Sequence, residues 1–182
     1  AGAATLREAA IRHLFLPETQ CFARGAVFPS DGGAPVLDRT VDASACGVFA
    51  FGMLPADDSR VQSTLKHLHA KLWCQTEVGG LARYENDPYF RENTQVPGNP
   101  WFVTTLWYAQ YLIASARRRA DLVPALAILE WTAAHALPSG VLAEQLDPQS
   151  GRPLSVSPLT WSHAAFVTAV REYQQQADRL PL

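Results

Sequence analysis

The sequence predicts an all-α fold in which about six helices alternate with long loops, with one short hairpin near the start of the chain. Three observations predict it. Apolar residues recur at intervals of three and four, N-cap residues and Pro or Gly mark the ends of these stretches, and the segments between them are long. Helices paired in this way suit a helical barrel or toroid better than a tight bundle. The 182 residues, of which 48% are hydrophobic, suit one domain or a large piece of a bigger one.

The first third of the chain predicts a helix, a hairpin and a second helix. Residues 5–16 carry apolar side chains at helical spacing, and Pro17 stops the pattern. Residues 20–28 are rich in strand-forming types, and the glycines that follow at 32–33 predict a turn and a short hairpin. Asp42 is an N-cap residue for a helix that runs to about residue 51.

Four further helices follow. A third begins after the capping residues 57–59, and its apolar stripe consists of Val61, Leu65, Leu68 and Leu72. Residues 74–98 form a long loop, which in compact domains is usually functional. The last helices are predicted from about residue 99 or 100 to residue 118, and at about residues 122–137 and 158–176. The arginines at 117–119 would lie at the C-terminal end of the first of these, where cations suit the helix dipole.

Composition and charge exclude several classes of function. A formal net charge of −2 argues against nucleic acid and anionic membrane surfaces as partners, and no run of about 20 apolar residues could span a bilayer. Three widely spaced cysteines and the lack of a signal peptide predict a reducing, cytoplasmic setting. No metal site is expected, because His67 and His69 point to different faces of a helix.

Two clusters carry the chemistry. Glu144 lies in a loop between two apolar helical segments, where a carboxylate can be a general base or an ordinary turn residue. Upstream, Arg83 and Asp87 stand among aromatic residues; they could form a simple loop salt bridge or bind sugar hydroxyls while the aromatic rings pack on sugar faces. Two tryptophans follow at helical spacing. Trp101 is predicted to lie in the site and Trp107 in the core.

These clusters resemble glycoside hydrolase family 15, the glucoamylase family, which also contains glucodextranases and some trehalases. Residues 80–107, with Gly80-Leu-Ala-Arg-Tyr and Gly98-Asn-Pro-Trp, resemble one catalytic segment. Residues 140–163, with Gly140-Val-Leu-Ala-Glu-Gln and Leu159-Thr-Trp-Ser-His, resemble the other, and residues 42–61 resemble the bacterial and archaeal branch. The order is that of the family, and several long motifs are more specific than one short pattern.

The resemblance implies an (α/α)6 barrel of twelve helices, of which residues 1–182 would supply about half, as the C-terminal half of the catalytic domain. Glu144 would be the general base of an inverting enzyme, and the general acid has no match in residues 1–41. The isolated chain is therefore expected to be inactive. Gln145 and Asn99 would fix the geometry of the loops, and His163 would be a structural, hydrogen-bonded histidine. The substrate-binding positions that the resemblance implies are Arg83, Tyr84, Asp87, Tyr89, Trp101, Gln145 and Trp161.

The function that the resemblance implies is that of an inverting, exo-acting α-glucosidase, with glucans or small glucosides such as trehalose as partners and no cofactor. The alternative is a non-catalytic carbohydrate-binding or regulatory module, since regulatory subunits of phosphorylase kinase also resemble this family. Half of a helical barrel would leave apolar faces uncovered, so self-association through these faces is expected.

Overall fold

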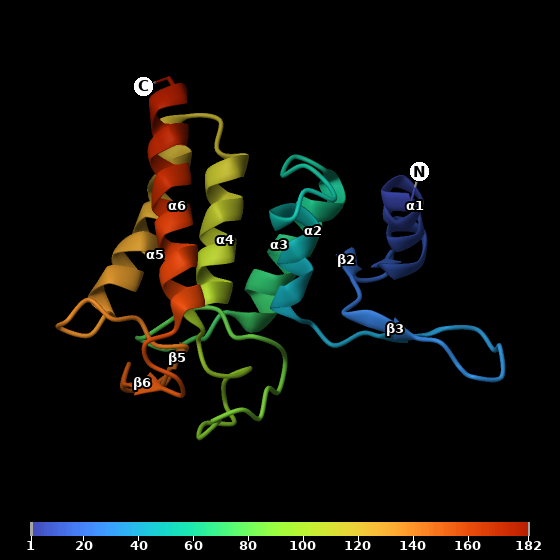
Figure 1. Cartoon of the computed structure of the whole chain (residues 1–182), viewed down its shortest axis with the longest axis horizontal. Coiled ribbons are helices and arrows are strands. Elements are labelled where there is room, and N and C mark those ends of the chain that lie inside the picture. Colours follow the sequence, from blue (N-terminus) through green and yellow to red (C-terminus); the bar gives the residue numbers. More distant parts are fainter. Residues whose placement is uncertain (1, 182) are drawn as a thin grey trace.

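Residues 2–181, which the computed structural model describes, fold into six α-helices, two short 3₁₀ helices and three two-stranded antiparallel hairpins (Figure 1). The α-helices are α1 (Gly2–Leu14), α2 (Gly47–Ala50), α3 (Ser59–Leu72), α4 (Phe102–Ser115), α5 (Val123–Ala134) and α6 (Thr160–Arg179). The 3₁₀ helices are η1 (Ala43–Cys46) and η2 (Arg119–Leu122). The strands are β1 (Phe15–Leu16), β2 (Cys21–Phe22), β3 (Gly25–Val27), β4 (Val36–Asp38), β5 (Gln145–Leu146) and β6 (Pro153–Leu154). The predicted all-α class is therefore confirmed.

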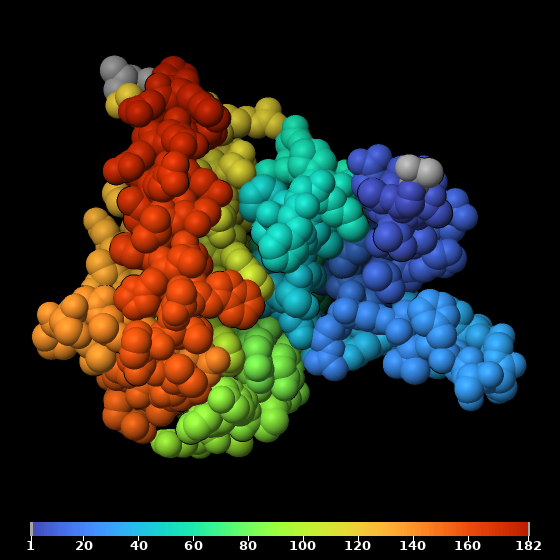
Figure 2. All heavy atoms as spheres, in the orientation of Figure 1, coloured from blue at the N-terminus to red at the C-terminus, as the bar shows by residue number. Residues whose placement is uncertain are grey.

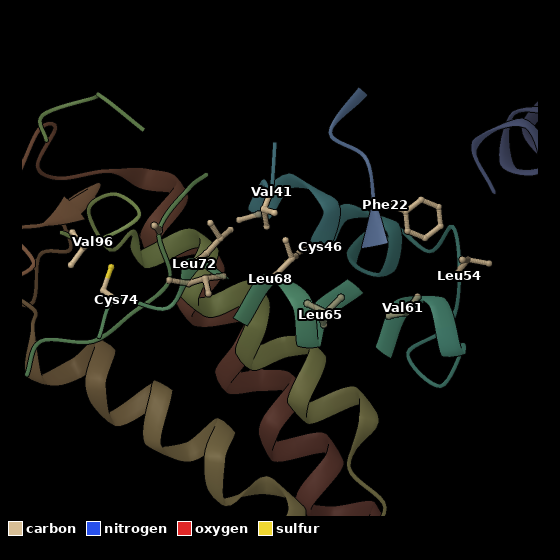
Figure 3. Close-up of a cluster of buried hydrophobic side chains, with 13 residues drawn as sticks. Phe22, Val41, Cys46, Leu54, Val61, Leu65, Leu68, Leu72, Cys74 and Val96 are labelled. Atoms are coloured by element: carbon tan, nitrogen blue, oxygen red, sulfur yellow. The ribbon is translucent and has the colours of Figure 1, made fainter. Parts of the chain in front are cut away.

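Helix α3 is the centre of the larger core. Asp58 caps it by accepting a hydrogen bond from the backbone N–H of Arg60 at 2.9 Å. The predicted apolar stripe is correct, because all four of its residues are fully buried. Figure 3 shows this stripe facing Phe22, Val41 and Cys46, which come from the chain before α3. The core thus joins the N-terminal third of the chain to the helices that follow it.

Helices α4, α5 and α6 pack against one another and enclose a second core (Figure 1). Phe102 and Leu106 of α4 meet Leu129 of α5 there. Two residues of the segment before β6, Leu142 and Leu146, are buried in the same cluster. The loop that carries Glu144 is therefore anchored from both sides of that residue.

The fourth helix is shorter at its start than the sequence predicts. Pro100 and Trp101 make isolated antiparallel bridges to Ala82 and Gln145, so their backbone is extended where a helix is predicted. The bridges supply hydrogen bonds that a helix start would leave unsatisfied. The predicted start at residue 99 or 100 is wrong for this reason, since α4 begins at Phe102.

The placement of the arginines at 117–119 is also wrong. Helix α4 ends at Ser115, and Ala116 is extended. The side chain of Asp121 then accepts hydrogen bonds from the backbone N–H groups of Arg117 at 3.0 Å and Arg118 at 3.2 Å. These contacts form a turn before η2, so the arginines follow the helix and do not cap it.

The N-terminal third differs from prediction in detail. Helix α1 ends at Leu14, because the next two residues pair with Cys21–Phe22 in a hairpin. The predicted hairpin is confirmed as β3–β4, with Gly32 at φ 79° in its turn. The helix predicted after Asp42 is split into η1 and α2, and Asp42 is its N-cap as predicted. Two hairpins, β1–β2 and β5–β6, were not predicted, since two-residue strands leave no alternating pattern.

The long loops gather at one end of the helices (Figure 1). Helix α3 ends there, α4 and α6 begin there, and the segment before η1 reaches the same end through the bridge between Asp42 and Tyr84. All the residues that the sequence marks as functional are carried by these loops or by the first turns of α4 and α6.

Several large apolar side chains are exposed on the surface of the molecule. The β3–β4 hairpin projects from the body (Figures 1 and 2), and its Phe28 is 77% exposed. Phe51 is 80% exposed, and within Gly2–Leu14 none of the residues is buried. These faces are of the kind that supports self-association, which stays a prediction. Among the described helices, none is long and apolar enough to cross a membrane.

Candidate active site

Glu144 is fixed by its backbone between two neighbouring segments. Its N–H donates to the carbonyl of Val156 at 2.9 Å, and its carbonyl accepts from the N–H of Phe102 at 3.3 Å. The carbonyl of the preceding Ala143 accepts a hydrogen bond from the buried hydroxyl of Ser162 at 2.7 Å. The side chain therefore starts from a position that α4, α6 and the chain after β6 all determine.

Glu144 is half-buried, and one of its carboxylate oxygens is buried without a hydrogen-bond partner in the described part of the chain. Its Oε2 atom is buried and has no hydrogen-bond partner among the described residues. A buried oxygen without a partner is rare in native structures and needs an explanation. An oxygen that must accept a proton from a bound water would be left free in this way.

Asp147 shapes the turn that follows Glu144. Its Oδ1 atom accepts hydrogen bonds from the N–H of Gln149, and from the N–H and the hydroxyl of Ser150, at 3.1, 2.7 and 2.8 Å. Burial pushes the pKa of Asp147 upward, but the hydrogen bonds from Ser150 and Gln149 outweigh it and hold the pKa below its usual value. The ionised carboxylate thus stabilises the β5–β6 hairpin.

Asp147→Ala is expected to lower the free energy of unfolding by about 1–2 kcal/mol at pH 7, since hydrogen bonds to a charged acceptor are lost. The pKa of Asp147 is lowered in the folded protein, so its stabilisation is present above the pKa of the unfolded chain, about 3.9, and disappears as the pH falls through the folded value. Urea unfolding from pH 7 to pH 3 measures it. Exposed Asp178, changed to Ala, is the control. A difference between wild type and Asp147→Ala that does not shrink at low pH would contradict this.

Arg83 lies inside a cage of one carboxylate and three aromatic rings. Its Nε and Nη2 atoms donate to the two carboxylate oxygens of Asp87, each at 2.8 Å. Its guanidinium carbon is 4.6 Å from the ring centre of Trp101, 4.9 Å from that of Tyr84 and 5.3 Å from that of Tyr89. The hydrogen bonds to Asp87 raise the pKa of Arg83 against the opposing effect of burial, so the cation is fixed in charge and direction.

The two partners in this ion pair have different roles. Asp87 is 1% exposed and also accepts from the N–H of Tyr89, so it orients Arg83 and does not face a ligand. The side chain of Arg83 is 34% exposed, and neither hydrogen bond to Asp87 uses its Nη1 atom. Of the two roles that the sequence leaves open for Asp87, orienting Arg83 and binding a hydroxyl, the contacts favour the first. Nη1 is the donor that a ligand could meet.

Two side-chain contacts join the Arg83 loop to the Glu144 loop. The amide of Asn99 donates to Gln145 Oε1 at 2.8 Å and to the carbonyl of Phe90 at 2.9 Å. The hydroxyls of Tyr89 and Ser155 are 3.1 Å apart. Gln145 is fully buried, which fits the predicted role in loop geometry and leaves it no surface for a sugar. His163 accepts at Nε2 from the N–H of Leu142, as the expected structural role requires.

A cavity of about 250 Å³ opens beside Arg83, between η1 and α4. Its walls include four of the predicted residues, Arg83, Tyr84, Trp101 and Trp161. Trp161 is 51% exposed. Glu144, Asp87, Tyr89 and Gln145 are not among the lining residues. The predicted residues thus divide into those that face the cavity and those that support it or lie beside it.

Sequence reasoning missed five residues that line this cavity: Asp42, Ser44, Val103, Thr104 and Trp107. Trp107 was assigned to the core, which is wrong in part. It packs on the α3 core but is only partly buried, and its ring meets that of Trp161 edge-on at 5.5 Å. Trp101 precedes α4 as its N-cap residue and Trp107 lies on α4, so helical spacing gave no signal that both face this cavity. Asp42 carried only the signal of a helix cap.

The described residues hold no group of three or more His, Cys, Asp or Glu side chains that could bind a metal ion. The three cysteines are buried and free. Burial raises the pKa of Cys21 to about 11 and that of Cys46 and Cys74 to about 12, so these thiols stay protonated and unreactive. The side chains that line the cavity offer one carboxylate, one guanidinium, hydroxyl groups and aromatic rings.

The chain is similar in sequence to known glycoside hydrolases. The model of glycosyl hydrolases family 15 matches residues 124–171, which contain Glu144 and Trp161. An uncharacterised glycosyl hydrolase of Methanocaldococcus jannaschii is 32% identical over 146 residues, covering 75% of this chain and 22% of the relative. The chain belongs to glycosyl hydrolases family 15. A glucoamylase of Neurospora crassa is 27% identical, covering 51% of this chain and 20% of the relative.

Solved structures of this family share the fold. A bacterial glucoamylase complexed with acarbose matches with a TM-score of 0.75 at 21% identity, over 95% of this chain and 28% of the other. A family 15 glucoamylase from Hypocrea jecorina matches with a TM-score of 0.62 at 16% identity, over 96% of this chain and 37% of the other. These matches confirm that the helices form part of an (α/α)6 barrel. The chain spans about a fifth of the length of the two curated relatives.

Proposed function

We propose that this chain carries the general base and part of the sugar-binding site of a glucoamylase-type glycoside hydrolase that inverts configuration and releases glucose from α-linked ends. The observation that carries the proposal is the buried, unpartnered Oε2 atom of Glu144, fixed by backbone contacts beside Trp101. Among the structural neighbours, a bacterial glucoamylase is complexed with acarbose and a glycosidase is complexed with glucose, which supports a glucoside as the ligand class.

In this mechanism Glu144 takes a proton from a water molecule while the water oxygen attacks the anomeric carbon. The α-glycosidic bond breaks on the opposite face, and the departing oxygen receives a proton from a second carboxyl group. In inverting enzymes the two carboxyl groups stand about 6.5–9.5 Å apart to admit the water. The product is β-glucose. Arg83 would bind a sugar hydroxyl through Nη1, which Asp87 orients by accepting hydrogen bonds from Nε and Nη2.

We propose that the second carboxyl group comes from outside residues 1–182. The chain spans about a fifth of its curated relatives, which leaves room for it elsewhere in a longer enzyme. A chain with the base and without the acid should still hydrolyse α-glucosyl fluoride, because fluoride leaves without being protonated. Maltose, whose leaving oxygen needs a proton, should then be hydrolysed slowly or not at all.

The test is hydrolysis of α-glucosyl fluoride, maltose, trehalose and cellobiose by the same preparation. The proposal predicts turnover of the fluoride and none of cellobiose, whose linkage is β. Turnover of maltose or trehalose as well would place a complete acid–base pair in this chain. No turnover of the fluoride would favour the non-catalytic sugar-binding module.

A further inference from the structure

A second cavity, of about 260 Å³, lies between the β1–β2 hairpin, α3 and the chain that follows β4. It shares no described lining residue with the cavity beside Arg83. The N–H of Phe22 in the hairpin donates to Thr64 Oγ1 of α3 at 3.3 Å, which holds these two walls together. Glu85 fixes the third wall, because its N–H donates to the carbonyl of Val41 at 3.0 Å and its Oε2 accepts from the N–H of Val41 at 3.1 Å. The cavity is therefore a built feature, separate from the candidate active site.

The buried part of the lining is apolar. It consists of Leu16, Cys21, Phe22 and Val41, two of which belong to the core cluster drawn in Figure 3. Burial raises the pKa of Cys21 to about 11, so this thiol adds no charge. A ligand that fills the cavity must therefore present carbon to these side chains, because polar groups placed there would lose their hydrogen bonds to water.

Arg39 offers this cavity an unused pair of donors. Its Nη1 atom contacts the carboxylate of Glu18, and no hydrogen bond or ion pair among the described residues uses its Nε or Nη2 atom. Arg60 and Arg83 each hold a carboxylate through that same pair of atoms. Nε and Nη2 form the side of a guanidinium that binds a carboxylate with two parallel hydrogen bonds. Arg39 therefore keeps its carboxylate-binding side free.

Lys71 gives the lining a second cation. It is exposed on the last turn of α3 and has no ion-pair partner within residues 2–181. His67 stands four residues earlier, on the same face of the helix. Glu85 is the carboxylate among the described lining residues, and one of its oxygens is already bound by Val41. Two cations against one carboxylate favour an anion of single charge.

We propose that this cavity binds a small organic carboxylate, with the carboxylate group on Nε and Nη2 of Arg39 beside Lys71 and the carbon chain against Leu16, Phe22 and Val41. The site goes beyond the proposed glycosidase function and does not depend on it. Inorganic phosphate and sulfate fit it poorly, because they have charge but no carbon to cover the apolar lining. Neutral sugars fit it poorly as well, because they leave both cations unpaired.

The experiment is titration of the ¹⁵N-labelled chain with hexanoate, followed by the NMR shifts of its backbone amides. Saturable shifts in residues 39–41 and 67–71 are expected, with a dissociation constant of about 1 mM, a usual strength for so small a ligand. Hexanamide has the same chain without the charge, and inorganic phosphate has charge without the chain. Each is expected to bind at least about 10-fold more weakly than hexanoate, since each lacks one of the two contributions.

Arg39→Gln is expected to raise the dissociation constant of hexanoate about 10-fold or more, the loss of charge-assisted hydrogen bonds. Lys71→Gln should weaken binding to a smaller extent. Two variants are matched controls. Glu18→Gln removes the same ion pair as Arg39→Gln but keeps the cation, so binding should not weaken. Lys66→Gln changes an exposed lysine of α3 that does not line the cavity, so binding should stay as in wild type.

Four outcomes would overturn the carboxylate site. They are hexanamide or phosphate binding as tightly as hexanoate, unchanged binding in Arg39→Gln, an equal loss in Glu18→Gln, and no saturable shift in the wild-type chain at tens of millimolar hexanoate. Arg39 and Lys71 are both exposed, so their variants are expected to fold, and the amide spectrum of each variant confirms the fold directly.

Discussion

Replacing Glu144 with Gln is expected to slow the hydrolysis of α-glucosyl fluoride by about 10²–10⁴-fold, which is the range for loss of a general base. Glutamine has nearly the same shape, so the backbone contacts to Val156 and Phe102 persist. What is lost is the basicity of Oε2, the buried oxygen without a partner. Because fluoride needs no proton to leave, the loss reports the base alone. A fluoride electrode measures the rate.

Glu130→Gln is the matched control for this substitution. Glu130 lies on α5 and is exposed, so the same chemical change occurs outside the candidate site. Its rate should equal that of wild type. A Glu144→Gln protein that turns over α-glucosyl fluoride within twofold of wild type would show that Glu144 is not the base.

Gly80→Ala is expected to destabilise the folded chain by about 2–4 kcal/mol, the combined cost of strained backbone and overpacking. Gly80 has φ 87°, a region that side chains other than Gly rarely adopt. A Cβ there would stand 2.7 Å from Cβ of Pro100 and 2.8 Å from the ring of Trp131. Pro100 immediately precedes Trp101 of the candidate site, and Trp131 is fixed by its indole N–H on the carbonyl of Val78. Neither neighbour can move freely, and urea unfolding measures the change.

Gly52→Ala separates the two causes of this destabilisation. Gly52 has φ 72°, so the backbone penalty is similar, but a Cβ there would meet nothing within 4 Å. Gly52→Ala should lower the free energy of unfolding by about 1 kcal/mol. If Gly80→Ala lowers the free energy of unfolding by no more than Gly52→Ala does, the close packing of this loop against Pro100 and Trp131 contributes nothing to stability.

The sequence predicts those parts of the fold that local patterns determine. The stripe of α3 and the caps Asp42 and Asp58 follow from residue types at fixed spacing, and the structure agrees. The start of α4 does not follow from local patterns. The bridges from Pro100 and Trp101 to distant residues override the helical preference of the segment. The hairpins with two-residue strands are not predicted for a related reason. Strands this short are stabilised by pairing with their partner strands and not by a local sequence pattern.

The candidate site is predictable as a set of residues but not as an arrangement. The motifs around Arg83 and Glu144 indicate which side chains matter. They do not indicate that Asp87 is buried behind Arg83, or that Trp107 faces a cavity with Trp161. Those facts depend on the crossing of α4 with α6 and on the bridge between Asp42 and Tyr84, which join segments far apart in the chain.

Glu144 is proposed to activate water for attack on the face of the sugar opposite the leaving group. Proton NMR during the first minutes of α-glucosyl fluoride hydrolysis tests it most directly, because the anomer first formed is visible before mutarotation mixes the two. β-Glucose is expected as the first product of the wild-type chain, and Glu144→Gln is expected to form none. α-Glucose as the first product, or β-glucose formed equally fast by the mutant, would contradict it.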